Sequence, residues 1–257
     1  MISVVTVTYN NFQELKDTLQ PLSHCKNIES IIINGGNCQQ TQEFLESYSG
    51  ASISERDEGI ADAFNKGVEL STGDAIVFLN SGDFLIDTTY YQKADVIFRE
   101  NDDIDFIYSD ITFVHSELTD LLVKPNLNFI GKMPFPHPSL IVRKKIFDQI
   151  GQFDSSFKTA MDFDFVYRML YAKAKGFYYQ EGPVVKMIGN GVSSTQGTQG
   201  LKERVKVLKK CDLWNYSTKN YVWKLYTKEC IRSFLSCLHL LKSYDAIKYK
   251  WKKLKPE

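Results

Sequence analysis

The fold is decided by residues 74–83, which read Asp-Ala-Ile-Val-Phe-Leu-Asn-Ser-Gly-Asp. The apolar run that ends at Leu79 is too short for an ordinary helix, and the Asn-Ser-Gly after it contains residue types that stop a strand and open a turn. The stretch therefore predicts a β-strand that delivers Asn80, Ser81 and Asp83 to a turn. In an open α/β sheet such a turn faces the ligand cleft, where an aspartate suits a divalent cation and a diphosphate. An ordinary surface turn is the alternative that this stretch alone leaves open.

Strands and helices alternate through the first eighty residues. Apolar β-type runs predict strands, and apolar residues at helical spacing predict helices between them. The expected strands are 2–8, 28–33, 51–54 and 74–79, and the expected helices are 11–22, 41–48 and 59–70. This alternation predicts an α/β fold with a mostly parallel, Rossmann-like sheet and helices on both faces. Right-handed crossovers then bring all four strand ends to one edge.

Polar side chains follow each predicted strand at that edge. They are Thr8, Tyr9, Asn10, Asn34, Glu55, Asp57, Asn80, Ser81 and Asp83. A nucleotide site needs these residue types, because aromatic and amide groups suit the base, carboxylates suit ribose, and a metal suits the phosphates. A dinucleotide-binding or P-loop motif is excluded, since Gly35-Gly36 is an isolated pair without the required glycine or lysine pattern.

The chain resembles family 2 glycosyltransferases of bacterial O-antigen and exopolysaccharide assembly, including the colanic-acid type. The strings that carry the resemblance occur in the family's order over residues 2–194: VVTVTYNN, IIINGGN, SERDEGIADAFNKG, TGDAIVFLNSGD, HPSLIVRKKIF, GQFDSSFKTAMDFDF and GVSS. The resemblance implies a GT-A fold, a nucleotide-sugar donor, a divalent cation, and transfer with inversion at the anomeric carbon.

The family pattern also implies roles for individual residues. Tyr9 and Asn34 would contact the base, and Asp83 would hold Mn²⁺ or Mg²⁺. The remaining residues of the expected nucleotide-sugar site are Thr8, Asp57, Asp62, Lys66, Asn80 and Ser81. Three positions depart from the common pattern: Asn34 replaces an aspartate, Val7 replaces a proline, and Asn80–Asp83 keeps only the last carboxylate of an acidic cluster. The diphosphate and water would complete the metal shell.

An inverting transfer also needs a carboxylate base opposite the leaving group. By resemblance, Asp162 takes this role in the segment Lys158–Phe165, where Met161 replaces the usual glutamate. Asp162 could instead cap the helix expected over 162–172. Asp164 is the second candidate base and a candidate on the acceptor side. An apolar wall, from Phe163 or Phe135, would help to keep the pKa of this carboxylate from falling too low for a base.

Two further residues are candidates for the acceptor side. His137 precedes the strand expected over 140–142, and the family often carries a histidine there, near the acceptor or diphosphate. Asp110 ends the strand expected over 106–109. An ordinary loop histidine and a strand-end aspartate are the alternatives.

Composition fits a globular enzyme. The chain has 257 residues, of which 43% are hydrophobic, enough for one α/β domain and an appendage. We expect a GT-A domain at 1–197 and a basic helical extension at 198–257. Five cysteines without metal spacing fit reduced thiols in the cytoplasm. We find neither a signal peptide nor an apolar run long enough to span a bilayer.

Charge is divided unevenly along the chain. Residues 201–257 contain 15 Lys and Arg against 5 Asp and Glu, a net charge of +10, whereas residues 1–200 contain 16 against 26, a net charge of −10. Residues 197–200 are the expected linker, followed by helices at 201–213 and 221–241. The lysines and aromatics of 248–255 favour an anionic membrane surface. A packed helix with solvated lysines is the alternative, and no nucleic-acid-binding motif accompanies the basic residues.

The sequence therefore predicts a metal-dependent inverting glycosyltransferase, peripheral on the cytoplasmic face of the inner membrane. It would move a hexose, with glucose as the first guess, or an N-acetylhexosamine from a UDP-sugar to a sugar-diphosphate-polyprenol in O-antigen, lipopolysaccharide or exopolysaccharide biosynthesis. A nucleotidyltransferase should carry a glycine-rich basic loop near residues 4–12, which is missing. A non-catalytic nucleotide-sugar-binding or scaffold protein of the same fold remains the alternative, because the acidic cluster is reduced.

Overall fold

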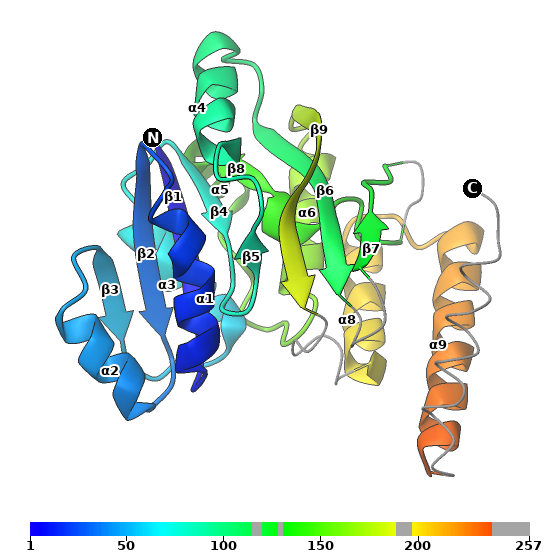
Figure 1. Ribbon diagram of the computed structural model, residues 1–257. Coiled ribbons are helices and arrows are strands. Elements are labelled where there is room, and N and C mark those ends of the chain that lie inside the picture. Colours follow the sequence, from blue (N-terminus) through cyan, green and yellow to red (C-terminus); the bar gives the residue numbers. More distant parts are fainter. Residues whose placement is uncertain (115–119, 128–130, 189–196, 238–257) are drawn as a thin grey trace.

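The computed structural model describes residues 1–114, 120–127, 131–188 and 197–237. Its strands form one nine-stranded sheet in the order β3-β2-β1-β4-β8-β6-β9-β5, with β7 paired to β6. The sheet and its flanking helices make up the body of the molecule, and the C-terminal helix extends from one side (Figure 1).

The first half of the sheet is parallel, as the sequence predicts. Its strands are β1 (Ile2–Thr8), β2 (Ile28–Asn34), β3 (Ala51–Ser54) and β4 (Ala75–Phe78). The helices between them are α1 (Phe12–Leu22), α2 (Gln39–Glu46) and α3 (Ile60–Leu70). In register, Thr8 lies beside Asn34 and Asn34 lies beside Ser54. The carboxyl ends of these strands therefore meet at one edge of the sheet.

The second half of the sheet is mixed. Its strands are β5 (Phe84–Leu85), β6 (Phe106–Val114), β7 (Asp120–Val123), β8 (Ile141–Arg143) and β9 (Gly176–Ile188). β8 runs antiparallel to both β4 and β6, whereas β6 and β9 are parallel. The sheet as a whole is thus less parallel than expected, because β8 lies between β4 and β6 and runs in the opposite direction to both.

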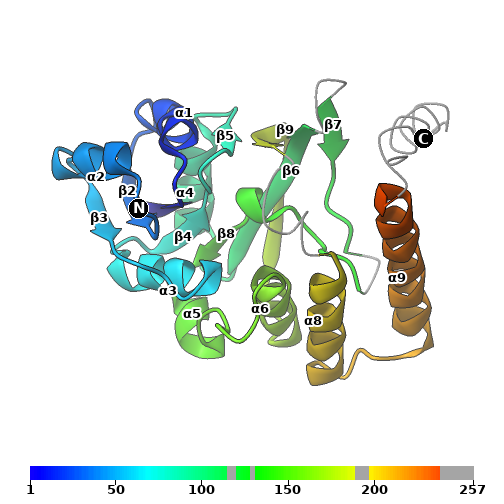
Figure 2. The ribbon, with the colours of Figure 1, turned by 90° about the horizontal axis from the view of Figure 1, so that it is seen from below.

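Helices cover both faces of the sheet. Figure 2 shows α3, α5 (Lys144–Ile150), α6 (Met161–Tyr171) and α8 (Gly197–Lys210) on one side and α1 with α4 (Tyr90–Glu100) on the other. Side chains of β1 alternate between the two cores, with Val5 in the first and Val4 in the second. Each fully buried side chain of this kind contributes about 1.5–3 kcal/mol, so the layers are held mainly by apolar burial.

The C-terminal part begins differently from the prediction. Residues 197–200, expected to be a linker, are the first turn of α8, because α8 packs on α6 and buries Val207 and Leu208 in the main core. A domain boundary at 197/198 would therefore separate α8 from the core that it completes. The last described helix, α9 (Tyr216–Cys237), packs on α8 and adds Val222 to this core, and its length extends past it (Figure 1).

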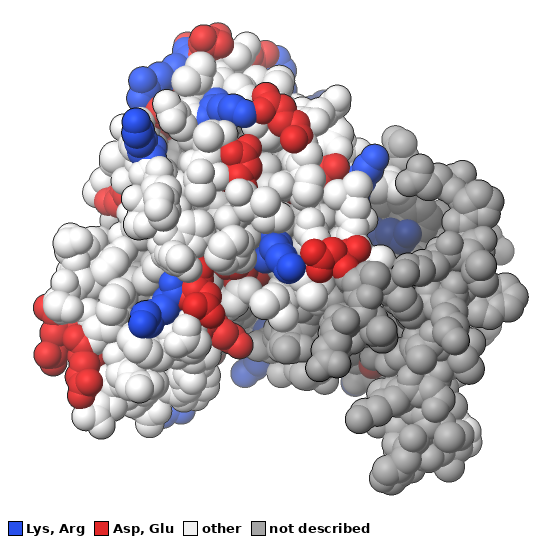
Figure 3. All heavy atoms as spheres, viewed as in Figure 1, with Lys and Arg blue, Asp and Glu red and all other residues white. Residues whose placement is uncertain are grey.

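Acidic and basic side chains lie interspersed on the described part of the face in Figure 3, so charge acts there locally rather than through one long-range field.

Cys25, Cys38, Cys211 and Cys230 are free. Of the helices that the structure describes, none combines the length and apolar character that crossing a bilayer requires.

Candidate active site

Asn11 joins the ends of β1 and β4. Its Oδ1 accepts hydrogen bonds from Thr8 Oγ1 at 2.7 Å and from Ser81 Oγ at 3.1 Å, and its Nδ2 donates to Glu14 Oε2 at 2.5 Å. The structure thus brings the predicted residues Thr8 and Ser81 together through a residue that sequence reasoning did not single out. The neighbouring Tyr9 is 71% exposed, so its ring is free to cover a ligand at this edge.

Asn34 lies fully buried at the end of β2. Its Nδ2 donates to Ser54 Oγ at 2.9 Å and to the Gly36 carbonyl at 3.2 Å, and its Oδ1 accepts from the Gly36 N–H at 3.1 Å. The amide therefore joins β2 to β3 and shapes the turn that leads from β2 into α2. A base that donates a hydrogen bond could use the second lone pair of Oδ1, whereas a base that accepts one would have to replace a bond of Nδ2.

Lys66 gathers three carboxylates beside this turn. Its Nζ lies 2.8 Å from Asp57 Oδ1, 2.9 Å from Glu55 Oε1 and 3.2 Å from Asp62 Oδ2. Burial opposes the charge of Lys66, but the hydrogen bonds to Asp57, Glu55 and Asp62 raise its pKa well above the usual range. The carboxylates outnumber the ammonium group, so this cluster can still accept hydrogen bonds from ligand hydroxyls.

A close approach of two loops confines this cluster. A Cβ placed on Gly35 would lie 1.9 Å from Asp57 Oδ2, so any larger residue there would displace this carboxylate. The backbone N–H of Glu58 donates to Asp62 Oδ2 at 3.1 Å. This hydrogen bond is the main reason why the pKa of Asp62 is lowered, and Lys66 adds to it. The predicted residues Asp57, Asp62 and Lys66 thus form one unit.

Asp83 is held inside the turn after β4. Its Oδ2 accepts a hydrogen bond from the Asn80 N–H at 3.2 Å, and the residue is only 5% exposed. Burial raises the pKa of Asp83 to about 7, although the Asn80 hydrogen bond opposes the shift. Within the same turn, Asn80 Oδ1 is buried and has no hydrogen-bond partner in the described structure.

The donor atoms of this turn suit a divalent cation. A carboxylate and an unpartnered amide oxygen are both hard oxygen ligands of the type that Mg²⁺ and Mn²⁺ accept. In the described part of the chain, no group of three or more His, Cys, Asp or Glu side chains is placed to hold a metal ion. The remaining ligands of a cation would therefore have to come from a bound substrate and water.

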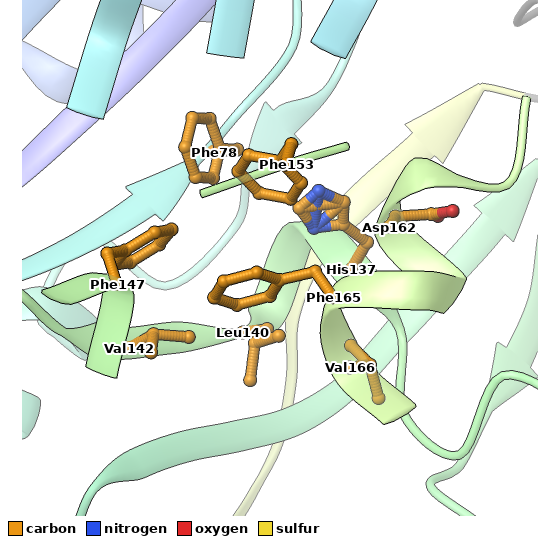
Figure 4. A pocket seen from close by; sticks show the side chains of 9 residues that line it. All are labelled: Phe78, His137, Leu140, Val142, Phe147, Phe153, Asp162, Phe165 and Val166. Atoms are coloured by element: carbon orange, nitrogen blue, oxygen red, sulfur yellow. The ribbon is translucent and has the colours of Figure 1, made fainter. Parts of the chain in front are cut away.

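Asp162 is the second residue of α6, after Ala160 at the N-cap position. It is half-buried, and its Oδ1 accepts a hydrogen bond from the Phe163 N–H at 2.7 Å. The aspartate lies at the rim of a small cavity of about 10 Å³, whose other walls include Phe78, Phe153 and Phe165 (Figure 4). An apolar wall is thus present, but neither Phe163 nor Phe135 lines this cavity.

His137 lies beside Asp162 rather than at an open acceptor surface. It begins the short 3₁₀ helix His137–Ser139, and its ring packs against Phe64 at 5.4 Å between centroids. Both ring nitrogens are buried without a hydrogen-bond partner in the described structure, although part of the residue reaches the surface. Burial lowers the pKa of His137 and Asp162 opposes this shift, so the imidazole is neutral at neutral pH.

Asp110 and Asp164 are both buried, but in different settings. Asp110 accepts a hydrogen bond from Tyr178 Oη at 2.5 Å, next to an irregularity in the pairing of β6 with β9. Bulges of this kind often adjoin functional sites. Asp164 is 0% exposed and forms ion pairs with Arg168 at 2.7 Å and Lys210 at 3.4 Å. The carboxylate of Asp164, expected on the acceptor side, thus joins α6 to α8 inside the core.

A larger groove of about 300 Å³ lies at the opposite edge of the sheet, at the amino ends of β1 and β4. It is lined by Met1, Ile2, Asp74, Ala75, Asp95, Phe98, Arg99, Asp102 and Arg143. Ligands of open α/β sheets bind at the carboxyl ends of the strands, so size alone does not make this groove the active site.

The chain is similar in sequence to known proteins. The sequence model of glycosyl transferase family 2 matches residues 3–153, more than half of the chain. A PGL/p-HBAD biosynthesis glycosyltransferase of Mycobacterium bovis is 24% identical over 182 residues, which cover 64% of this chain and 68% of the relative. An uncharacterized glycosyltransferase of Haemophilus influenzae is 26% identical over 189 residues, which cover 66% and 62% of the two chains.

Solved structures share the fold. S. aureus TarS 1–349 in complex with UDP-GlcNAc matches with a TM-score of 0.66 and 16% identity, over 82% of this chain and 65% of that one. The mannosyltransferase PcManGT from Pyrobaculum calidifontis, in complex with GDP-Man and Mn²⁺, matches with a TM-score of 0.61 and 11% identity, over 100% and 76%. The expected GT-A architecture is thereby confirmed.

The burial of Asp83 predicts a pH-dependent stability for the metal-free protein. The carboxyl keeps its proton up to about pH 7 in the folded state but ionises near pH ~4 in the unfolded chain. Between these values the folded state binds more protons, so the free energy of unfolding falls as pH rises from about 4 to about 7 and then levels off. Asp83→Asn should remove this part of the slope in urea unfolding at pH 5–8. Equal slopes for both proteins would contradict a buried, protonated Asp83.

Proposed function

Because the chain belongs to glycosyl transferase family 2, we propose that it transfers a hexose or N-acetylhexosamine from a UDP-sugar to an acceptor hydroxyl, with inversion at the anomeric carbon. The observation that carries this proposal is that Asp162 lies at the start of α6 and that its side chain is half-exposed. Asp164, the other carboxylate in that first turn, is closed inside ion pairs. One carboxylate is therefore left to accept a proton there.

The strand ends supply the donor site in this proposal. Tyr9 covers the base, and the carboxylates around Lys66 accept hydrogen bonds from ribose hydroxyls. Thr8 and Ser81 lie at the same edge, where their hydroxyl groups both donate hydrogen bonds to Asn11 Oδ1. Mn²⁺ or Mg²⁺, held by Asp83 and Asn80, would neutralise the diphosphate when bound. TarS, a structural neighbour that binds UDP-GlcNAc, supports the choice of a UDP-linked donor.

Asp162 acts as the general base. The acceptor oxygen attacks the anomeric carbon from the face opposite the diphosphate, the bond to the leaving oxygen breaks, and Asp162 takes the hydroxyl proton. The aromatic side chains of the cavity and the neutral His137 keep water from one side of this carboxylate. Asp110 and Tyr178 would line the acceptor side, since their hydrogen bond is placed at the β6–β9 irregularity.

The acceptor in this proposal is a sugar-diphosphate-polyprenol at an anionic membrane surface, as in O-antigen and exopolysaccharide assembly. Support comes from α9, where Tyr216, Trp223 and Phe234 are 85%, 66% and 65% exposed. Helical spacing puts these three side chains on one face. The basic tail expected to bind the membrane, residues 244–257, lies outside the described residues. A non-catalytic protein of the same fold would need neither Asp162 nor this lipid-facing surface.

Replacing the base tests the reaction. Asp162→Asn keeps the shape of the side chain but cannot accept a proton, so turnover should fall by at least about a hundredfold while donor affinity is unchanged. Transfer to a sugar-diphosphate-lipid is measured with a panel of nucleotide sugars, and donor binding by calorimetry. Asp164→Asn is the comparison, which should lose stability but keep turnover per folded molecule within a few-fold. If Asp164→Asn is inactive and Asp162→Asn is active, the two roles must be exchanged.

The metal site has its own test. Asp83→Ala should lower Mn²⁺-supported transfer by about a thousandfold, because leaving-group neutralisation depends on the cation. Asn80→Asp, which adds a second carboxylate to the same turn, should keep activity. Transfer by the wild-type protein that persists in excess chelator, and at a similar rate in Asp83→Ala, would contradict the assignment.

Membrane attachment is tested by deleting residues 244–257. The truncated protein should remain folded and bind the donor, but lose co-sedimentation with anionic vesicles and activity on acceptors embedded in them. Trp223→Ser/Phe234→Ser should weaken vesicle binding independently of the deletion. High salt should release the intact protein, because the attraction is partly electrostatic. Unchanged vesicle binding, or a melting temperature that falls by many degrees after truncation, would favour a packed tail.

A further inference from the structure

Glu203 of α8 binds the turn that leads into α6. Its Oε2 accepts hydrogen bonds from the Thr159 N–H at 2.9 Å, Thr159 Oγ1 at 2.9 Å and the Ala160 N–H at 3.0 Å. Its Oε1 accepts from the Lys158 N–H at 3.1 Å and from Gln199 Nε2 at 2.8 Å. The residue is 1% exposed, so this carboxylate is buried among donors that belong mainly to one short turn.

The bonds to Glu203 lie where α6 has no side-chain cap at its N-cap position. Backbone N–H groups at the start of a helix have no partner inside the helix, and a side chain at the N-cap position normally supplies one. The N-cap residue of α6 is Ala160, which makes no side-chain cap. Glu203, more than forty positions later in the chain, accepts the N–H of Ala160 and those of Lys158 and Thr159 just before the helix, and it places a negative charge at the positive end of the helix.

Other contacts hold α8 in place against this turn. A Cβ on Gly200 would lie 3.2 Å from Thr159 Oγ1, so a small residue permits the close approach. The Arg204 guanidinium lies 5.3 Å from the centre of the Phe163 ring. Burial acts to raise the pKa of Glu203, but hydrogen bonds from Gln199, Thr159 and Lys158 outweigh it and lower the pKa, so the residue stays ionised.

We propose that Glu203 is a positioning residue for the reaction, which holds the first turn of α6 so that the Asp162 carboxylate faces the acceptor hydroxyl. Asp162 follows Ala160 by two residues, and any rotation of this turn moves its side chain. The inference rests on the proposed function, since it takes Asp162 as the base. It assigns a role in the active site to a helix outside residues 3–153, the part that the family model matches.

Glu203→Gln is the direct test. A glutamine has one acceptor oxygen and one NH₂ group, so whichever way the amide is turned, donors of the turn meet another donor. We expect kcat to fall by about ten- to a hundredfold, because displacement of a catalytic group by about 1 Å costs up to about 10²-fold, with the KM for the donor unchanged. Thr159→Val, which removes only the bond from Oγ1, should give a smaller loss of kcat with the same unchanged KM.

Lys210→Gln is the matched control. Lys210 belongs to the same helix and reaches Asp164 and Asp154 at 3.4 and 3.5 Å, and its ion pairs in the described part of the chain do not involve the turn 158–160. Lys210→Gln should lower the melting temperature only slightly, because half-exposed ion pairs contribute little, and should keep kcat within about threefold, because the bonds to the turn 158–160 remain. If both variants lose activity in proportion to their stability, Glu203 has only a structural role and the proposal is wrong.

A double-mutant cycle separates this inference from the function on which it rests. If Glu203 acts through Asp162, Glu203→Gln should cause no further loss in an Asp162→Asn background, whereas independent effects would multiply. Multiplied losses would overturn the positioning role. Should Asp162→Asn turn over normally, the proposed base itself fails. Should Asp162→Asn be inactive and Glu203→Gln and Thr159→Val both be fully active, only the present inference fails.

Discussion

The parallel pairing of β1 with both β2 and β4 is the constraint on which the rest of the structure depends. Because Thr8 lies in register with Asn34, and Val5 with Phe78, the turns after these strands open at one edge of the sheet. Asn11 then bonds the turns after β1 and β4, while Asn34 bonds β2 to β3. The polar groups of the candidate donor site are therefore positioned by backbone hydrogen bonds within a buried sheet, which is a rigid support.

The other half of the proposed site depends on elements added after β4. The antiparallel strand β8 extends the sheet and leads into α5, and α6 then brings Asp162 to the rim of the aromatic cavity. α8 packs on α6 through buried Val207 and Leu208 and through charged contacts at Glu203, Arg204 and Lys210. The parallel half thus carries the candidate donor site, and the helical layer of the second half carries the candidate base.

Local patterns in the sequence were sufficient for the first half of the fold. Short apolar runs, separated by segments with apolar residues at helical spacing, predicted β1 to β4. The polar residues that follow these runs were predicted to share one edge of the sheet. Long-range partners could not be predicted in this way. The burial of Asp164, the unpartnered ring of His137 and the bond of Glu203 to the turn 158–160 each depend on a packing neighbour distant in the chain. The first turn of α8 resembled a linker because Gly197 and Gly200 are weak helix formers.

The account is tested most directly by a crystal structure of the chain with a UDP-sugar and Mn²⁺. We predict that the nucleotide lies across the carboxyl ends of β1, β2 and β4, with the diphosphate beside the turn Asn80–Asp83. The carboxylate of Asp162 should then face the anomeric carbon from the side opposite the diphosphate. A nucleotide bound in the groove between Asp74, Asp95 and Arg143, or an anomeric carbon out of reach of Asp162, would contradict the account.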